Sequence, residues 1–146
     1  AWMDICGNCQ QVIHPHDSVS CVVAYEGIGR ELVLAYKKSR GRAYLSCMVE
    51  LLSLRSSCGP VAPGSAGGPV VVCGIPRHPV DCLLRGGSKG DLLAAAFAAR
   101  QGLVFRQLLR KRRWTVRQAG LGRKPRLRNL RGAFAIRGSS LSALNE

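Results

Sequence analysis

Two stretches in the first half of the chain place apolar residues at helical spacing. Residues 28–38 carry an apolar position every three or four residues, which predicts a helix with one buried side. Its last turn ends in Lys37 and Lys38, where cations suit the helix dipole. Residues 43–55 predict a second helix, and because it is apolar on nearly every side, we expect it to be deeply packed.

Three shorter apolar runs predict strands. Residues 19–25 are rich in β-branched and apolar side chains and end at the turn signal Glu26-Gly27. Residues 70–75 form a continuous apolar run that a proline stops, as is typical of a strand buried on both faces of a parallel sheet. Residues 133–136 predict one more strand near the end of the chain.

The segments between these elements complete an α/β pattern. Residues 56–69 include ten Gly, Pro or Ser among fourteen positions, which predicts a flexible loop within one domain. Residues 85–91 form a glycine-rich turn that opens a helix through about Gln101, and residues 123–131 predict a short basic helix interrupted by Pro125. This order predicts an α/β fold with a small, partly parallel sheet and flanking helices.

The length and hydrophobic content of the chain indicate a single domain. The chain has 146 residues, of which 47% are hydrophobic, enough for one domain with a core. The longest apolar run, residues 92–99, is far shorter than the roughly 18 residues of a membrane-spanning helix, and the first residues do not resemble a secretory leader. Three of the seven cysteines fall inside predicted elements, where cysteine packs as a small apolar residue. We therefore expect a cytoplasmic protein without a membrane span.

The chain is strongly and unevenly basic. Lys and Arg number 22 against 8 Asp and Glu, a net charge of +14, and 13 of the basic residues lie between Asp91 and Glu146 with no carboxylate among them. Such a field attracts polyanions, and it does not choose among nucleic acid such as single-stranded DNA, an acidic membrane surface and small phosphorylated ligands. Two alternatives stay open: a basic face that only keeps the protein soluble, and arginines folded back onto Asp81, Asp91 or apolar surface. The candidate nucleic-acid contacts are Arg110, Lys111, Arg112, Arg113, Arg123 and Lys124.

The glycine-rich turn is a candidate phosphate or pyrophosphate site. Glycines let backbone N–H groups approach an anion, and the positive end of the following helix favours it. Arg85 and Lys89 add full charges at this place. The turn lacks the Gly-Lys-Ser/Thr order of a Walker loop and the spacing of a dinucleotide fingerprint. A turn that merely begins a helix, capped by Ser88 with Asp91, is the alternative.

Cys6 and Cys9 have the spacing of one half of a zinc ribbon. A second Cys-x-x-Cys pair is absent downstream, and His14 and His16 are cramped as further ligands. We expect either a partial site, which binds zinc weakly or across a dimer, or two uncoordinated thiols.

Three further motifs follow one another along the chain. They are Tyr25-Glu26-Gly27; Ile75-Pro76-Arg77-His78 with Arg85-Gly86; and Thr115, Gln118, Leu121 and Arg126 with Asn129-Leu130-Arg131-Gly132-Ala133-Phe134. Together with the cysteine pair, they resemble the ComF family, competence-associated proteins related to type I phosphoribosyltransferases. The resemblance covers roughly residues 6–136, and its last motif is the most specific.

The resemblance implies a division of the chain and a ligand. Residues 1–18 would be the remnant of a zinc-ribbon-like segment, and residues 19–146 an incomplete type I phosphoribosyltransferase-like domain. The implied partner is phosphoribosyl pyrophosphate, with magnesium on the pyrophosphate, and the implied process is competence and DNA uptake. The residues implied at the pyrophosphate are Arg85, Gly86, Ser88 and Lys89, with His78 nearby and Lys37 at a phosphate.

The sequence departs from the family pattern at positions that the family's activity needs. The sequence has no counterpart for three features of the family. They are the earlier cysteine pair, the two aspartates that bind the ribose, and the Thr-Thr-Gly loop that binds the ribose 5-phosphate. We therefore expect a chain truncated at both ends that does not turn over phosphoribosyl pyrophosphate, and no catalytic base is assigned. The alternatives are a non-catalytic basic module that binds nucleic acid and a decayed reading frame without activity.

Overall fold

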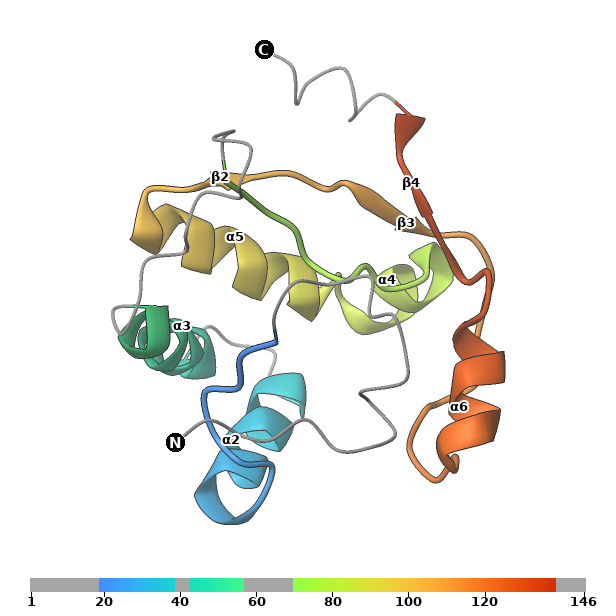
Figure 1. The fold of residues 1–146 in the computed structure, drawn as a ribbon, viewed down its shortest axis with the longest axis horizontal. Coiled ribbons are helices and arrows are strands. Elements are labelled where there is room, and N and C mark those ends of the chain that lie inside the picture. The colour runs from blue at the N-terminus through green and yellow to red at the C-terminus, as the bar shows by residue number, and fades with distance from the viewer. Residues whose placement is uncertain (1–18, 39–42, 57–69, 139–146) are drawn as a thin grey trace.

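The computed structural model describes residues 19–38, 43–56 and 70–138, which form a mixed α/β arrangement (Figure 1). This part of the chain has five helices and four short strands, so the α/β class is confirmed. The helices are α2 (Gly27–Lys38), α3 (Ala43–Ser56), α4 (Pro79–Arg85), α5 (Lys89–Gln101) and α6 (Arg123–Leu130), and the strands are β1 (Val71–Val72), β2 (Val104–Phe105), β3 (Leu109–Lys111) and β4 (Phe134–Ile136).

Strands β1 and β2 are parallel neighbours. Val71 pairs with Val104 and Val72 with Phe105, and the N–H of Arg106 extends the ladder by donating to the Val72 carbonyl at 3.0 Å. Parallel strands need a crossover between them, and the chain supplies it as α4 and α5. The predicted parallel pairing is confirmed, but the strand is shorter than residues 70–75. The expected burial on both faces is wrong, because β1 lies in a two-stranded pair in which its residues are half-buried, and Ile75 is 72% exposed.

Strands β3 and β4 form a separate antiparallel pair. Leu109 lies opposite Ile136 and Lys111 opposite Phe134. The described residues therefore hold two two-stranded sheets, and the prediction of one partly parallel sheet is wrong in this respect. Strand β3 carries part of the basic run, with the Arg110 side chain exposed and its neighbours half-buried, because successive side chains of a strand point to opposite sides.

Helix α5 lies at the centre of the described fold, between the β1–β2 pair and α3 (Figure 1). The buried cluster is made by Tyr36 of α2 with Leu45 and Val49 of α3, and Leu93 and Ala96 of α5 pack against it. The predicted helices over residues 28–38 and 43–55, and the helix that the glycine-rich turn opens through Gln101, are confirmed with small shifts of their ends. None of the helices in the described ranges is long and apolar enough to cross a membrane.

The expected deep packing of α3 is wrong. Its buried residues, Leu45, Val49 and Ser53, form a single stripe spaced four apart, whereas Leu54 is 66% exposed. The reason is that the contacts with α2 and α5 bury one stripe of this helix, and Leu54 lies outside that stripe.

Two further expectations about local structure are wrong. The stretch predicted as a strand, residues 19–25, is irregular, with Val19 74% and Val23 45% exposed, because β-branched composition forms a strand only where another strand pairs with it. Pro125 does not interrupt α6. It is the third helical residue, where the missing N–H would have had no partner inside the helix.

Candidate functional site

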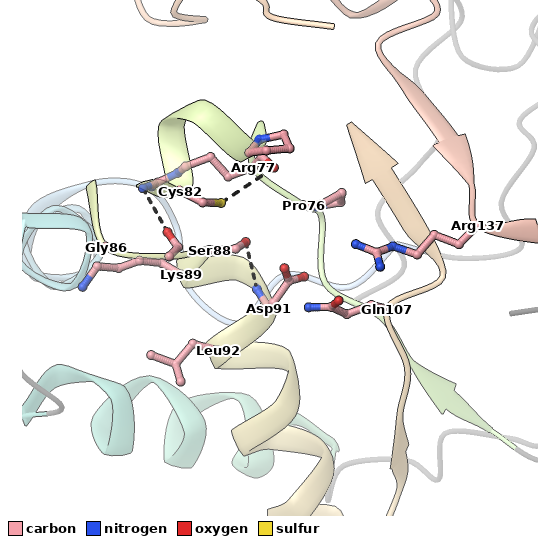
Figure 2. A pocket seen from close by; sticks show the side chains of 12 residues that line it. Pro76, Arg77, Cys82, Gly86, Ser88, Lys89, Asp91, Leu92, Gln107 and Arg137 are labelled. Carbon is pink, nitrogen blue, oxygen red and sulfur yellow. Dashed lines mark hydrogen bonds between the residues drawn. The ribbon is translucent and has the colours of Figure 1, made fainter. Parts of the chain in front are cut away.

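A cavity of about 650 Å³ opens at the carboxyl ends of β1 and β2 (Figure 2). Its walls come from the segment after β1, from the start of α5, from Gln107 after β2 and from Arg137 after β4. Ligands of open parallel α/β sheets bind outside the carboxyl ends of the strands, because the backbone diverges there and the following helices point their N-termini into the gap. This cavity is therefore the leading candidate site.

The glycine-rich turn leads directly into α5. Gly86 and Gly87 have φ values of +77° and +89°, which side chains other than glycine's rarely adopt. Ser88 is the N-cap, and its Oγ accepts a hydrogen bond from the N–H of Asp91 at 3.4 Å. The predicted cap at Ser88 is confirmed, and the same turn also lines the cavity.

Two other glycines let α5 touch the end of β1. A Cβ on Gly74 would lie 2.6 Å from Oδ1 and 2.8 Å from Cα of Asp91, and a Cβ on Gly90 would lie 2.8 Å from the Ile75 carbonyl oxygen. A Cβ atom does not approach other non-bonded heavy atoms this closely unless something moves. Because Gly74 and Gly90 have no side chains, the first turn of α5 can pack directly against the segment that follows β1.

Positive side chains outnumber negative ones around the cavity. Arg77 lies over the turn, where its Nη1 donates to the Gly87 carbonyl at 3.3 Å, and Arg137 points in from the opposite wall (Figure 2). Asp91 is the single carboxylate among the described lining residues, and its side chain shares the space with Gln107 and Arg137 (Figure 2). With Lys89, whose side chain extends away from Asp91 (Figure 2), the described lining holds three cations and one carboxylate and carries a net positive charge.

Lys89 is held by the hydrophobic core. Its Nζ lies 5.2 Å from the centroid of the Tyr36 ring, a cation–π contact, and the Tyr36 hydroxyl donates to the Lys89 carbonyl at 2.7 Å. Burial raises the pKa of Tyr36, so the hydroxyl stays protonated as a donor. The hydrogen bond and the cation–π contact both link the start of α5 to Tyr36 of α2.

The predicted pyrophosphate residues divide into two groups. Gly86, Ser88 and Lys89 line the cavity, while Arg85 is the last residue of α4. His78 and Lys37 lie outside this lining: His78 caps α4, with Nδ1 accepting from the Val80 N–H at 3.4 Å, and Lys37 lines a neighbouring cavity. Sequence reasoning did not assign Arg77, Asp91 or Arg137 to the site.

The segment over residues 113–131 forms a hydrogen-bonded unit around α6. Arg113 Nη2 donates to the carbonyls of Asn129 at 3.0 Å and Arg131 at 2.9 Å. Arg126 Nη2 donates to the carbonyls of Gln118 at 3.3 Å and Leu121 at 3.2 Å. The alternative of folded-back arginines is therefore confirmed for these two, with backbone carbonyls as acceptors instead of the carboxylates of Asp81 and Asp91.

The remaining nucleic-acid candidates lie at two places. Arg110, Lys111 and Arg112 line a second cavity of about 670 Å³ together with Arg137, whereas Arg123 and Lys124 are exposed at the start of α6. Lys111 also lies over the Phe134 ring, with Nζ 6.0 Å from its centroid.

Cys6 and Cys9, and with them the whole segment 1–18, lie outside the described residues. Within the ranges that the structure describes, no group of three or more His, Cys, Asp or Glu could hold a metal ion. The partial zinc site stays a prediction.

Comparison of the chain with protein-family models, with curated proteins and with solved structures found no match. Function is therefore inferred from the cavities, their charges and the sequence motifs.

Proposed function

We propose that the chain binds the diphosphate group of phosphoribosyl pyrophosphate in the cavity between β1, β2 and α5, as a phosphoribosyltransferase-like protein of the ComF kind. The observation that carries the proposal is the position of this positively lined cavity at the carboxyl edge of a parallel pair and at the start of the 13-residue helix α5. Competence and DNA uptake, implied by the sequence resemblance, are the proposed process.

The chemistry of the lining suits a diphosphate. The first turn of a helix leaves backbone N–H groups without partners inside the helix, and the helix dipole makes this end positive. Gly86 and Gly87 carry no side chain that would keep an anion away from the backbone. Arg77 and Arg137 reach the cavity from two sides, and guanidinium groups bind phosphate oxygens with two parallel hydrogen bonds.

Asp91 fits the magnesium that accompanies such a ligand. Magnesium is commonly held by one or two carboxylates together with the phosphates of the substrate, and Asp91 supplies one carboxylate in this cavity. When bound, the ion would neutralise part of the diphosphate charge. The protein residues around it orient the ligand.

We expect inorganic pyrophosphate and phosphoribosyl pyrophosphate to bind the chain with similar affinity in isothermal titration calorimetry with magnesium present. Arg77→Ala should weaken both at least about tenfold, because a charge-assisted hydrogen bond contributes about 1.5–3 kcal/mol. Arg137→Ala should weaken them comparably, since its guanidinium points into the same cavity.

Arg128→Ala is the matched control for these titrations. Arg128 lies in the last turn of α6 and does not line the cavity, so its removal changes the net charge by the same amount without touching the site. Equal weakening by Arg128→Ala and Arg77→Ala would mean that pyrophosphate responds to overall charge, and the proposed site would be wrong.

Nucleic-acid binding is a second candidate function, favoured by a set of exposed cations. The side chains of Arg110, Arg112, Arg123 and Lys124 are exposed and make no hydrogen bond or ion pair with the described residues. Arg113 and Arg126 are exposed too, but their guanidinium groups bind backbone carbonyls. Such cations contact phosphates and carry no sequence preference.

If these four cations bind a single strand, the affinity for a single-stranded DNA oligonucleotide should fall steeply with salt. Neutralising all four to alanine should reduce the slope of log K against log salt by about 3, because each phosphate contact contributes about 0.7 on a single strand. Fluorescence anisotropy at several salt concentrations measures this slope. Arg100→Ala, which removes a cation paired with Glu50 at 3.2 Å, should leave it unchanged. An unchanged slope in the fourfold variant would exclude these residues as contacts.

A further inference from the structure

A third cavity, of about 700 Å³, adjoins the diphosphate cavity and shares Arg77 with it. Its lining combines cations from distant parts of the chain with an indole and a carboxamide: Lys37, Arg77, Lys111, Arg117, Trp114 and Gln118. Asp81 is the single carboxylate among the described residues that line it, so this lining is positive as well.

Trp114 is an exposed aromatic ring in a fixed position. It is 61% exposed and lies nearly parallel to the His78 ring, with 6.3 Å between centroids and 20° between planes. His78 is itself fixed as the N-cap of α4. An indole of this kind offers a flat surface for a second aromatic ring, and an indole face also attracts cations and electron-poor heterocycles.

Gln118 adds an unused pair of hydrogen-bonding groups. Its side-chain nitrogen and oxygen are both buried and have no hydrogen-bond partner among the described residues. Buried polar side-chain atoms are nearly always paired, so an unpaired carboxamide in a cavity wall calls for an explanation. A carboxamide offers one donor and one acceptor side by side, which is the pattern that the edge of a heterocyclic base complements.

We infer that this third cavity binds the base and phosphate of a mononucleotide. The base stacks on Trp114 next to Gln118, and the phosphate is neutralised by the cations on the cavity wall, Lys37, Lys111 and Arg117. The volume lies within the range of small-ligand sites, roughly 300–1,000 Å³, which favours a single nucleotide over a strand. The inference goes beyond the diphosphate site and does not depend on it.

Tryptophan fluorescence tests the inference directly, because the chain has two tryptophans, Trp2 and Trp114. In a Trp2→Phe variant the emission comes from Trp114, and adenosine 5′-monophosphate should quench it in a saturable way. Ribose 5-phosphate carries the same phosphate without a base, and it should leave the emission unchanged.

Calorimetry should show that Trp114→Leu weakens the binding of adenosine 5′-monophosphate about tenfold, since stacking of one base on an aromatic side chain accounts for an effect of this order.

The controls separate stacking from folding and from charge. Because Trp114 is exposed, its replacement should leave the far-ultraviolet circular dichroism unchanged, and Trp114→Phe, which keeps a ring, should retain most of the affinity. Lys37→Ala should weaken the binding of adenosine 5′-monophosphate, and it should leave the quenching of Trp114 emission by free adenine unchanged. Saturating pyrophosphate should not displace the nucleotide, so failure of the diphosphate site would leave this result standing.

Three results would overturn the inference. They are quenching by ribose 5-phosphate equal to that by adenosine 5′-monophosphate, an affinity that Trp114→Leu does not change, and a thymidine decanucleotide that binds Trp114 far more tightly than any mononucleotide. The last result would assign the indole to a nucleic-acid strand.

Discussion

Replacing Gly74 with alanine is expected to destabilise the fold by about 2 kcal/mol and to abolish measurable pyrophosphate binding, since overpacked sites typically cost about 1–3 kcal/mol. The new Cβ would meet the backbone of Asp91 at 2.8 Å and its Oδ1 at 2.6 Å. Backbone atoms of a helix cannot move aside singly, so the first turn of α5 must shift away from β1. The cavity would then lose the geometry of its glycine turn. Urea denaturation and isothermal titration calorimetry measure the two effects.

Gly138→Ala is the matched control for this substitution. No heavy atom of the described residues lies within 4 Å of a Cβ built at Gly138, and its φ is not in the left-handed region. Surface substitutions away from special features change stability by no more than about 0.5 kcal/mol, and we expect this variant to behave so. If Gly74→Ala were as stable as Gly138→Ala and bound pyrophosphate normally, α5 would not be seated on β1 as described.

Tyr36→Ala is expected to destabilise the protein by about 3 kcal/mol, in the range of large aromatic-to-alanine substitutions in a core. Tyr36 is 5% exposed and belongs to the cluster that joins α2, α3 and α5. The substitution also removes the hydroxyl that binds the Lys89 carbonyl and the ring beneath the Lys89 ammonium group. Pyrophosphate affinity should fall too, because the start of α5 loses its tie to α2.

Two tyrosine variants separate packing from hydrogen bonding. Tyr44 lies on α3 and is 41% exposed, so Tyr44→Ala should cost far less than Tyr36→Ala in the same urea denaturation. Tyr36→Phe removes the hydroxyl alone and should cost about 1 kcal/mol, the typical net contribution of one hydrogen bond. Equal losses in Tyr36→Ala and Tyr44→Ala would show that the cluster around Tyr36 does not support the fold.

The sequence is a good guide to the helices that make the core. The apolar spacing of residues 28–38 and the glycine and serine before α5 are local signals, and helices depend on contacts between near neighbours in the chain. Strand formation depends on a partner elsewhere in the chain. The apolar run at residues 71–72 is a strand because residues 104–105 pair with it, whereas residues 19–25 have the same composition and no strand partner within the described ranges.

The candidate site was predictable only in part for the same reason. The glycine turn and Ser88 follow one another in sequence, so a local pattern identified them. Arg137 reaches the cavity from the residue after β4, and only the pairing of β3 with β4 brings it there. Charge alone did not distinguish Arg113 and Arg126, whose guanidinium groups bind backbone carbonyls, from neighbouring cations that make no such bond with the described residues.

The central claim is that a diphosphate binds at the start of α5. The most direct test is nuclear magnetic resonance of the ¹⁵N-labelled chain titrated with pyrophosphate and magnesium. The account predicts saturable shifts of the backbone N–H signals of Gly86–Gly90, with the Nε–H signals of Arg77 and Arg137 shifting at the same ligand concentration. Shifts confined to the exposed cations of β3 and α6, or none at Gly86–Gly90, would contradict it.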